Sequence, residues 1–197
     1  MRKIVNPVRL AIRKSILKKS EFSEMDLIIG PFFNSTQKVV ASYCKANKIK
    51  MVCPVSSNSS VLENNRLVYT SVPSDVTLIK GLAKYTLEYN SGDNILLIKP
   101  TKKSDLVLYD AFKSAFYDTP IANGATRPRL IETDISNMKL FIKRGQKTIF
   151  ILPTNDRNTA MKFMNSLNRS SFRSKADDMY VYGTKEWVNF SDINNTY

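Results

Sequence analysis

Short apolar runs alternate with amphipathic stretches along most of the chain. The apolar runs have the length of strands, and several end at Gly or Pro, whereas the longer stretches repeat apolar residues at helical spacing. This pattern predicts strands at residues 26–30, 49–53, 67–72, 94–98, 129–133, 147–152 and 179–182. It predicts helices at 36–47, at 75–90 after an N-cap at Ser74, after an N-cap at Ser104, at 138–143 and around 160–167.

The alternation of strands and helices indicates the fold class. It favours parallel sheets that are covered by helices on both faces, so we expect an α/β fold. In the helix at 36–47 the apolar residues at helical spacing are Val39, Val40, Tyr43 and Cys44. The turn SVPSD at 71–75 is the best candidate for a crossing between two lobes.

The amino-terminal segment is basic and contains no acid over its first twenty residues. As a helix it would place Val8, Ala11, Ile12 and Ile16 on one face, which is typical of an ordinary surface helix, although a targeting peptide has the same character. The segment lacks the continuous apolar core of a secretion signal, so we identify no signal peptide in this chain. No run of the sequence is long and apolar enough to span a membrane.

The charge balance favours acidic partners only weakly. The chain of 197 residues carries 30 Lys and Arg against 17 Asp and Glu, a net charge of +13. Such a balance raises the expectation of nucleic acid, acidic polymers or anionic lipid as partners. The basic residues are spread along the sequence, however, and no nucleic-acid-binding motif accompanies them. We therefore favour a solvated surface and expect no specific nucleic acid partner.

The residue types needed for most catalytic sites are missing. There is no histidine in the chain, which excludes histidine-based triads, metal sites and acid–base chemistry. Two cysteines, Cys44 and Cys53, cannot form a four-ligand zinc site alone. Two buried thiols are favoured over a disulfide, which remains an alternative. No glycine-rich loop or nucleophile elbow is present. We expect no enzyme activity, no metal and no cofactor.

Polar side chains follow two predicted strands at the point where a helix or loop begins. Asn34, Ser35 and Thr36 follow the strand at 26–30, and Ser56, Ser57 and Asn58 follow the strand at 49–53. Ligands of open α/β sheets bind at such strand ends, where helix N-termini present unpaired N–H groups to carboxylates. From spacing alone, simple capping of the helix by Asn34 or Ser35 is favoured for the first loop.

A third strand-end loop, at 183–187, contains the only tryptophan of the chain. Trp187 is suited to the wall of a ligand cleft, and packing in the local core is an equal alternative. Glu186 beside it is an available carboxylate. Both residues are kept as candidate ligand contacts.

Residues 26–75 carry a wider pattern, DLIIGPFFNSTQKVVASYCKANKIKMVCPVSSNSSVLENNRLVYTSVPSD. It resembles the type I periplasmic solute-binding proteins, the leucine/isoleucine/valine-binding group and its relatives. The segments that match in order and spacing are Gly30-Pro31, Asn34-Ser35-Thr36, Pro54 with Ser56-Ser57-Asn58, and Pro73-Ser74-Asp75. KTIFILPTNDRNTAMKFMNSL resembles the strand and helix of the second lobe. MYVYGTKEWVNFSDINNTY resembles an envelope-associated branch that is often fused to LysM modules, which bind peptidoglycan.

The resemblance implies two Rossmann-like lobes, an incomplete amino-terminal lobe at 1–74 and a carboxyl-terminal lobe at 75–197. It implies that the loops at 34–36 and 56–58 hold a ligand carboxylate and that the second lobe closes over it by a hinge around 73–75. The chain departs from the family at 99–105, where KPTKKSD replaces a Tyr-Gly signature. The opening strand-helix-strand of the fold and its final return to the first lobe are missing, so we expect a truncated chain.

Two functions follow from the resemblance. The first is non-catalytic capture of an amino acid or peptide-like ligand in an interlobe cleft, as in the substrate-binding component of an ABC transporter. The alternative is a structural or regulatory module of the cell wall with the same fold and no small ligand, whose partner is peptidoglycan or an envelope protein. An outer-membrane lipoprotein that activates penicillin-binding proteins is a distant relative of this second kind. Either function implies a periplasmic or envelope location.

Overall fold

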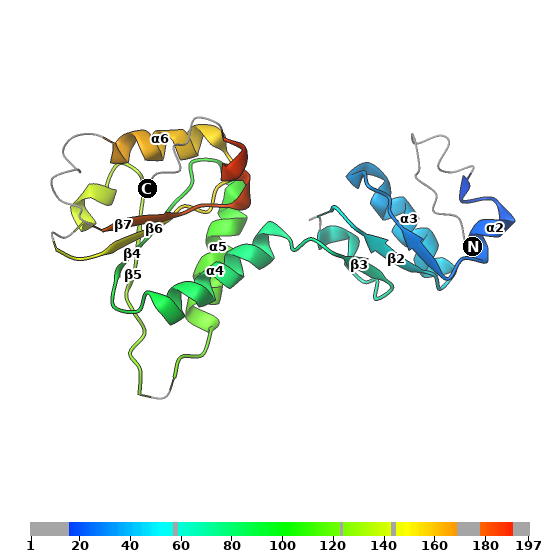
Figure 1. The fold of residues 1–197 in the computed structure, drawn as a ribbon, viewed down its shortest axis with the longest axis horizontal. Coiled ribbons are helices and arrows are strands. Elements are labelled where there is room, and N and C mark those ends of the chain that lie inside the picture. Colours follow the sequence, from blue (N-terminus) through cyan, green and yellow to red (C-terminus); the bar gives the residue numbers. More distant parts are fainter. Residues whose placement is uncertain (1–15, 57–58, 123, 143–144, 169–177, 191–197) are drawn as a thin grey trace. The chain divides into compact units, whose positions relative to one another are not determined.

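The computed structural model describes residues 16–56, 59–122, 124–142, 145–168 and 178–190. The chain divides into two compact units, Met1–Ser74 and Asp75–Tyr197. Each unit is an α/β structure, and each is described here by itself (Figure 1). The helix expected over the first twenty residues falls mostly outside the described residues, which begin at Ile16 and include a short helix α2 at Ser20–Ser23.

The first unit is built on a three-stranded parallel sheet with the order β1-β2-β3. Its strands are β1 (Leu27–Ile29), β2 (Lys50–Cys53) and β3 (Val68–Thr70). Helix α3 (Asn34–Ala46) connects β1 to β2, and a short 3-10 helix η1 (Ser59–Val61) precedes β3. The parallel order follows from these crossover connections, because a tight hairpin would have produced antiparallel neighbours.

The core of the first unit lies on one face of its sheet. Val40, Ala41 and Cys44 of α3 are buried there together with residues of the sheet and of η1, namely Met51, Cys53, Val61 and Val68. Val39, one of the apolar residues at helical spacing, lies outside this core and is 39% exposed. The buried stripe includes the polar Gln37 one turn before Val40, and this polar residue disguised the true apolar face.

The second unit contains a four-stranded parallel sheet with the order β5-β4-β6-β7. The strands are β4 (Asn94–Ile98), β5 (Leu130–Thr133), β6 (Thr148–Ile151) and β7 (Met179–Tyr182). Three α-helices accompany them, namely α4 (Asp75–Tyr89), α5 (Leu106–Asp118) and α6 (Arg157–Leu167). Three 3-10 helices complete the described part, namely η2 (Lys103–Asp105), η3 (Met138–Phe141) and η4 (Lys185–Asn189).

Helices cover both faces of this second sheet. Helices α4 and α5 pack on one face, and α6 packs on the other (Figure 1). The central strand β4 supplies both cores, because its successive side chains point to opposite faces. Ile95 and Leu97 join the α4/α5 core, whereas Leu96 and Ile98 join the α6 core. All five residues of β4 are buried, as expected for a parallel strand between two layers of helices.

The predicted strands all occur, and several local expectations need correction. Ser104 does not cap a helix. It lies within η2 and donates its hydroxyl to the carboxylate of Asp105, which holds the N-cap position of α5. The helix expected at 138–143 is the 3-10 turn η3. Cys44 and Cys53 are free and buried, so the disulfide alternative is wrong.

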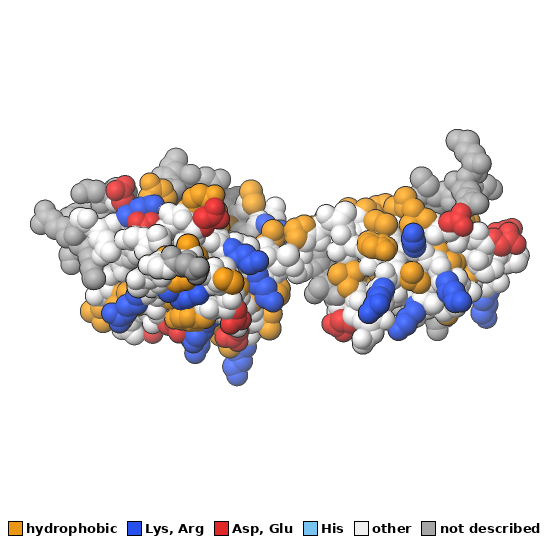
Figure 2. Space-filling view, turned by 90° about the horizontal axis from the view of Figure 1, so that it is seen from below, with side chains coloured by type: hydrophobic (Ala, Val, Ile, Leu, Met, Phe, Trp, Pro, Cys, Tyr) orange, Lys and Arg blue, Asp and Glu red, His pale blue; other side chains and the backbone are white. Residues whose placement is uncertain are grey.

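Charged side chains are spread over both units. On the face shown in Figure 2, Lys and Arg side chains alternate with apolar and acidic ones on each unit and do not gather into one patch. Among the described residues, no helix combines the length and the apolar character that crossing a bilayer requires.

Candidate functional site

The carboxyl edge of the first sheet is organised by a buried glutamine. Gln37 is 0% exposed, and its amide oxygen accepts a hydrogen bond of 2.9 Å from the hydroxyl of Ser56, which belongs to the loop after β2. Its amide nitrogen donates to the carbonyl of Pro31 in the loop after β1, at 3.4 Å. One side chain of α3 therefore ties the two predicted polar loops together.

The loop after β1 turns sharply at Gly30. Its φ of 114° lies in the region that only glycine adopts readily, and the following peptide bond to Pro31 is cis. The amide of Gly30 still donates to the carbonyl of Val52, at 2.8 Å, so the turn begins directly at the edge of the sheet. The sequence pattern DLIIGP thus ends β1 and directs the chain into α3.

The structure shows different environments for the residues predicted in this unit. Thr36 is buried, and its hydroxyl donates to the carbonyl of Phe33 at 2.8 Å. Ser56 is buried on Gln37, whereas Ser35 is exposed. Helix α3 begins at Asn34 with Phe33 at the N-cap position, so neither Asn34 nor Ser35 holds the N-cap position that the capping interpretation gave them. Ser57 and Asn58 lie outside the described residues.

The carboxyl edge of the second sheet contains a topological switch point between β4 and β6. The chain leaves β4 toward α5 on one face, and it leaves β6 toward α6 on the other. Open α/β sheets bind ligands in the crevice that this reversal creates. A recess of about 310 Å³ lies here, lined by Thr101 and Lys102 after β4 and by Asp156, Asn158, Thr159 and Lys162 after β6.

A buried carboxylate fixes the loops around this recess. Asp105 is 6% exposed, and one of its oxygens accepts hydrogen bonds from the hydroxyl of Thr154 at 2.6 Å and from the amide of Asn155 at 3.1 Å. The segment after β4 and the segment after β6 are thereby held together. No local sequence pattern indicates this role, because Asp105 and Thr154 are far apart in the chain.

Asp156 shapes the rim of the recess as the N-cap of α6. It accepts hydrogen bonds from the amide and the hydroxyl of Thr159, each at 2.8 Å, and these bonds hold the pKa of its carboxyl below the usual value. The ammonium of Lys102 lies 3.8 Å from the other carboxylate oxygen and is itself more than half exposed. The carboxylate is engaged by the helix, and Lys102 presents its charge to solvent beside it.

A smaller cavity of about 140 Å³ lies between the start of α4 and the loop after β7. Asp75, one of its lining residues, forms an ion pair of 3.0 Å with Lys185 and accepts a hydrogen bond of 2.9 Å from the side-chain amide of Asn155. Lys185 follows β7 and Asn155 follows β6, so Asp75 connects the first helix of this unit to two neighbouring strand-end loops. These contacts satisfy the charges within the unit.

Trp187 and Glu186, the predicted ligand contacts in the loop after β7, both make hydrogen bonds within the second unit. The indole nitrogen of Trp187 donates to the carbonyl of Thr154 at 2.9 Å, and the hydroxyl of Thr184 donates to the same oxygen at 2.9 Å. The indole covers Gly183, where an added Cβ would lie 2.4 Å from the ring. Glu186 is partly exposed and accepts a hydrogen bond from Asn189 at 3.2 Å. Trp187 therefore packs locally, and Glu186 lies on the adjacent turn.

The described residues provide groups for binding. Among them, no cluster of three or more Asp, Glu or Cys side chains is arranged to hold a metal ion. The two thiols are buried, and burial raises the pKa of Cys44 to about 11, which makes it a poor nucleophile near neutral pH. Hydroxyl, amide and ammonium groups at the strand ends suit anionic or zwitterionic ligands.

Comparisons with known proteins identify the fold. No family model and no curated protein matches the sequence. Among solved structures, an ABC transporter substrate-binding protein from Desulfitobacterium hafniense in complex with Leu aligns with 90% of this chain and 51% of its own, at 14% identity and a TM-score of 0.53. A second structure, also of an ABC transporter substrate-binding protein from Desulfitobacterium hafniense, aligns with 88% of this chain and 50% of its own, at 14% identity and a TM-score of 0.54.

Full-length LpoA from Haemophilus influenzae is similar to the same degree. It aligns with 86% of this chain and 30% of its own, at 9% identity and a TM-score of 0.53. The chain thus spans about half the length of the substrate-binding proteins and about a third of LpoA. At these identities the likeness concerns the fold alone. The parallel sheets flanked by helices form part of a fold like that of the type I periplasmic binding proteins.

Proposed function

We propose that this chain binds a small ligand of the amino-acid or peptide class without transforming it. The observation that carries the proposal is the recess at the switch point between β4 and β6, the place where open α/β sheets hold their ligands. The fold of the chain is similar to that of a substrate-binding protein in complex with Leu, and this similarity supports an amino acid or peptide as the ligand. A periplasmic or envelope location accompanies the proposal.

Lys102 is the proposed contact for the carboxylate of a ligand in the recess, because it combines an exposed ammonium with a position on that recess. Within the first unit, Ser35 presents an exposed hydroxyl at the second residue of α3 and is kept as a separate candidate contact. Thr36 and Ser56 shape the loops of the first unit through their internal hydrogen bonds. Ser57 and Asn58 are retained as proposed contacts from the sequence alone. Glu186 is the proposed partner for a ligand amino group.

A thermal-shift screen with amino acids, dipeptides and muropeptides tests the proposal. A ligand that binds only the folded chain raises the melting temperature in proportion to its saturation. We expect at least one compound to raise it, and we expect Lys102→Gln or Ser35→Ala to reduce the shift. Lys84→Gln and Ser42→Ala change exposed residues away from the strand ends and serve as matched controls. Retention of the full shift in both test variants would contradict the assigned contacts.

A second function is favoured by the comparison with LpoA. The TM-score to LpoA equals that to the leucine-bound protein, so the fold supports a structural or regulatory module of the cell envelope equally well. Its partner would be peptidoglycan or an envelope protein. This function predicts no thermal shift with any small compound and retention of the chain by a cell-wall fraction.

A further inference from the structure

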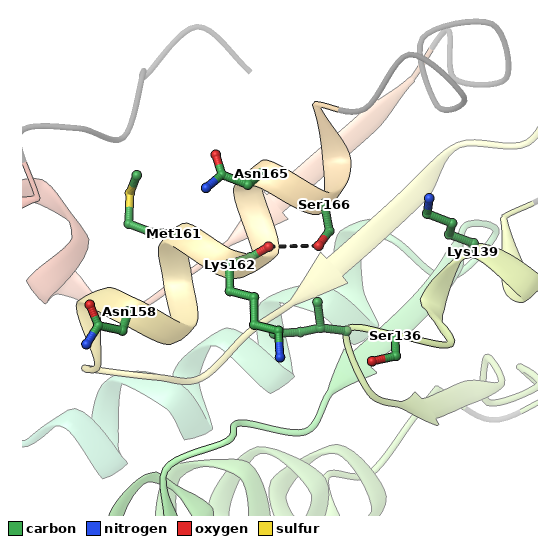
Figure 3. Close-up of a pocket in the computed structure, with 8 residues that line it drawn as sticks. Ser136, Lys139, Asn158, Met161, Lys162, Asn165 and Ser166 are labelled. Atoms are coloured by element: carbon green, nitrogen blue, oxygen red, sulfur yellow. Dashed lines mark hydrogen bonds between the residues drawn. The ribbon is translucent and has the colours of Figure 1, made fainter.

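A long groove lies on the side of the second unit where α6 meets the segment after β5. Its volume is about 700 Å³, and its walls are Ile135, Ser136 and Lys139 on one side and Asn158, Met161, Lys162, Asn165 and Ser166 on the other. Lys162 points from α6 toward the Ser136 segment (Figure 3). The groove is thus formed within one unit by two segments of defined structure.

The helical wall of the groove is the outward face of an amphipathic helix. Its members repeat at the spacing of one helix face, whereas the residues between them, Ala160, Phe163, Met164 and Leu167, are buried in the core. The outward face presents two amides, one ammonium, one hydroxyl and one thioether. These groups offer both hydrogen-bond donors and acceptors along the length of α6.

The charge of the groove is positive. Lys139 and Lys162 are both exposed, and none of the residues that line the groove is acidic. The nearest acid of the preceding loop, Asp134, accepts hydrogen bonds from the amides of Ser136 and Asn137 at 2.8 and 2.9 Å. Those bonds, with a smaller contribution from the charge of Lys162, hold the pKa of Asp134 below its usual value.

The groove continues into the recess at the strand ends. Asn158 and Lys162 line both, and the recess adds Lys102 and Thr101. The only carboxylate of the recess, Asp156, is engaged as the cap of α6. Three ammonium groups, those of Lys102, Lys139 and Lys162, therefore line one continuous path, and this arrangement suits a chain with several anionic groups better than a single small ion. The protein as a whole has a net charge of +13, which also favours the approach of an anionic polymer.

We propose that this groove binds an acidic glycan, a sugar chain that bears carboxylate or phosphate groups. The ammonium groups pair with the anionic substituents, and the Asn and Ser side chains exchange hydrogen bonds with sugar hydroxyls. Met161, which is partly exposed, offers apolar contact to the face of a sugar ring. None of the lining residues is aromatic, so the groove lacks the stacking surfaces that single-stranded nucleic acids use. The proposal does not depend on the small ligand proposed above.

The test compares the full chain with a double variant, Lys139→Gln with Lys162→Gln. Binding is measured by fluorescence anisotropy to labelled polygalacturonate, a sugar chain that carries carboxylates, and to labelled phosphomannan, a sugar chain that carries phosphates. We expect at least one polymer to bind in low salt, and we expect the double variant to weaken that binding by about tenfold or more. The two polymers distinguish the carboxylate from the phosphate source.

Lys80→Gln with Lys84→Gln removes the same net charge from exposed positions on α4 and is the matched control. We expect this control to retain nearly all the affinity of the unmodified chain, and we expect neutral dextran not to bind. Equal weakening by the two double variants would show an effect of overall charge and would overturn the proposal. So would the absence of binding to both polymers, or tighter binding to a single-stranded oligonucleotide of equal charge.

Discussion

Asp105 shows how a single side chain positions the proposed site of the second unit. Its carboxylate is buried, and it accepts hydrogen bonds from the hydroxyl of Thr154 and the amide of Asn155. The carbonyl of Thr154 in turn accepts from Trp187 and Thr184. Loops that follow β4, β6 and β7 are therefore connected through two neighbouring groups. This connection holds in place the two segments, after β4 and after β6, that line the recess.

The substitution Asp105→Asn tests that dependence. An amide offers one oxygen and introduces an N–H that the buried site has no place for, so we expect the free energy of unfolding to fall by about 1.5–3 kcal/mol. Urea denaturation of the second unit measures the change. Asp110→Asn, an exposed substitution on α5, is the control, with an expected change within about 0.5 kcal/mol. Equal effects of the two substitutions would show that the Asp105 contacts contribute little.

Glu132 makes a pH-dependent contribution to the free energy of unfolding. The ammonium of Lys113 and the hydroxyl of Tyr109 donate to its carboxylate at 2.9 and 2.6 Å, and these bonds lower its pKa below the usual value. Because the folded-state pKa is depressed, the stabilisation is present above the unfolded-state pKa and is lost as the pH falls through the folded one. Glu132→Gln should therefore lower stability at pH 7 but not at the acidic end of the titration.

The expected loss at pH 7 is about 0.5–1 kcal/mol, a small value because about a third of the Glu132 side chain is exposed and solvent screens the pair. Urea denaturation of both proteins between pH 3 and pH 7 measures the difference. A difference that stays constant across this range would mean that ionisation of Glu132 is not its source.

Side-chain hydrogen bonds and burial were the features that the sequence predicted least well. The roles of Gln37 and Asp105 are not predictable from the sequence, since their partners lie in other strand-end loops and no local pattern indicates them. Thr36 and Ser56 were selected for exposed chemistry, yet both are buried. A polar residue at helical spacing from Val40 and Cys44 was the one available signal for Gln37. Burial is decided by the tertiary fold, which the periodicity of a single helix does not contain.

At the scale of elements, the short helix η4 is held against the sheet by Trp187. The indole lies over Gly183 so closely that an added Cβ would be 2.4 Å from the ring. Gly183→Ala should displace η4 and lower the free energy of unfolding by about 1–3 kcal/mol. Because Trp187 is the only tryptophan, its emission should also shift to longer wavelength as the ring becomes exposed.

Gly81→Ala is the matched control for this substitution. Gly81 lies in α4 with no atom within 4 Å of an added Cβ, so alanine should stabilise the helix by about 0.5–1 kcal/mol and leave the emission unchanged. Unchanged emission in Gly183→Ala would contradict the packing of the indole on Gly183.

The elements themselves were largely predictable. Every predicted strand is present because apolar runs of strand length between turn residues have few other ways to bury their side chains. The predicted ends of the strands were less accurate. The strand predicted at 67–72, for example, spans only Val68–Thr70. Short helices were also less accurate, since a 3-10 turn such as η3 and an α-helix share the same local apolar spacing at this length.

At the scale of the whole molecule, the two units differ in how fully their sheets are covered. Helices pack on both faces of the sheet in the second unit. In the first unit the described core lies on one face, and Leu27, Ile29 and Tyr69 on the strands are 46%, 42% and 50% exposed. Less apolar surface is buried there, so we expect the first unit to be the less stable of the two.

Hydrogen exchange of the full chain measures this difference. Amides of β4 and β6 should be the slowest to exchange, and amides of β1 to β3 should exchange through openings of lower free energy. Equal protection of the two sheets would show that the first is stabilised by contacts beyond those described.

The proposed function requires that the chain holds a small amino-acid or peptide-like ligand and leaves it unchanged. Isothermal titration with the compound that raises the melting temperature most, followed by mass spectrometry of the recovered compound, tests it most directly. We expect a saturable heat, a reduced affinity in Lys102→Gln but not in Lys84→Gln, and a ligand of unaltered mass. The absence of a saturable heat for every compound, or conversion of the ligand to a product, would contradict it.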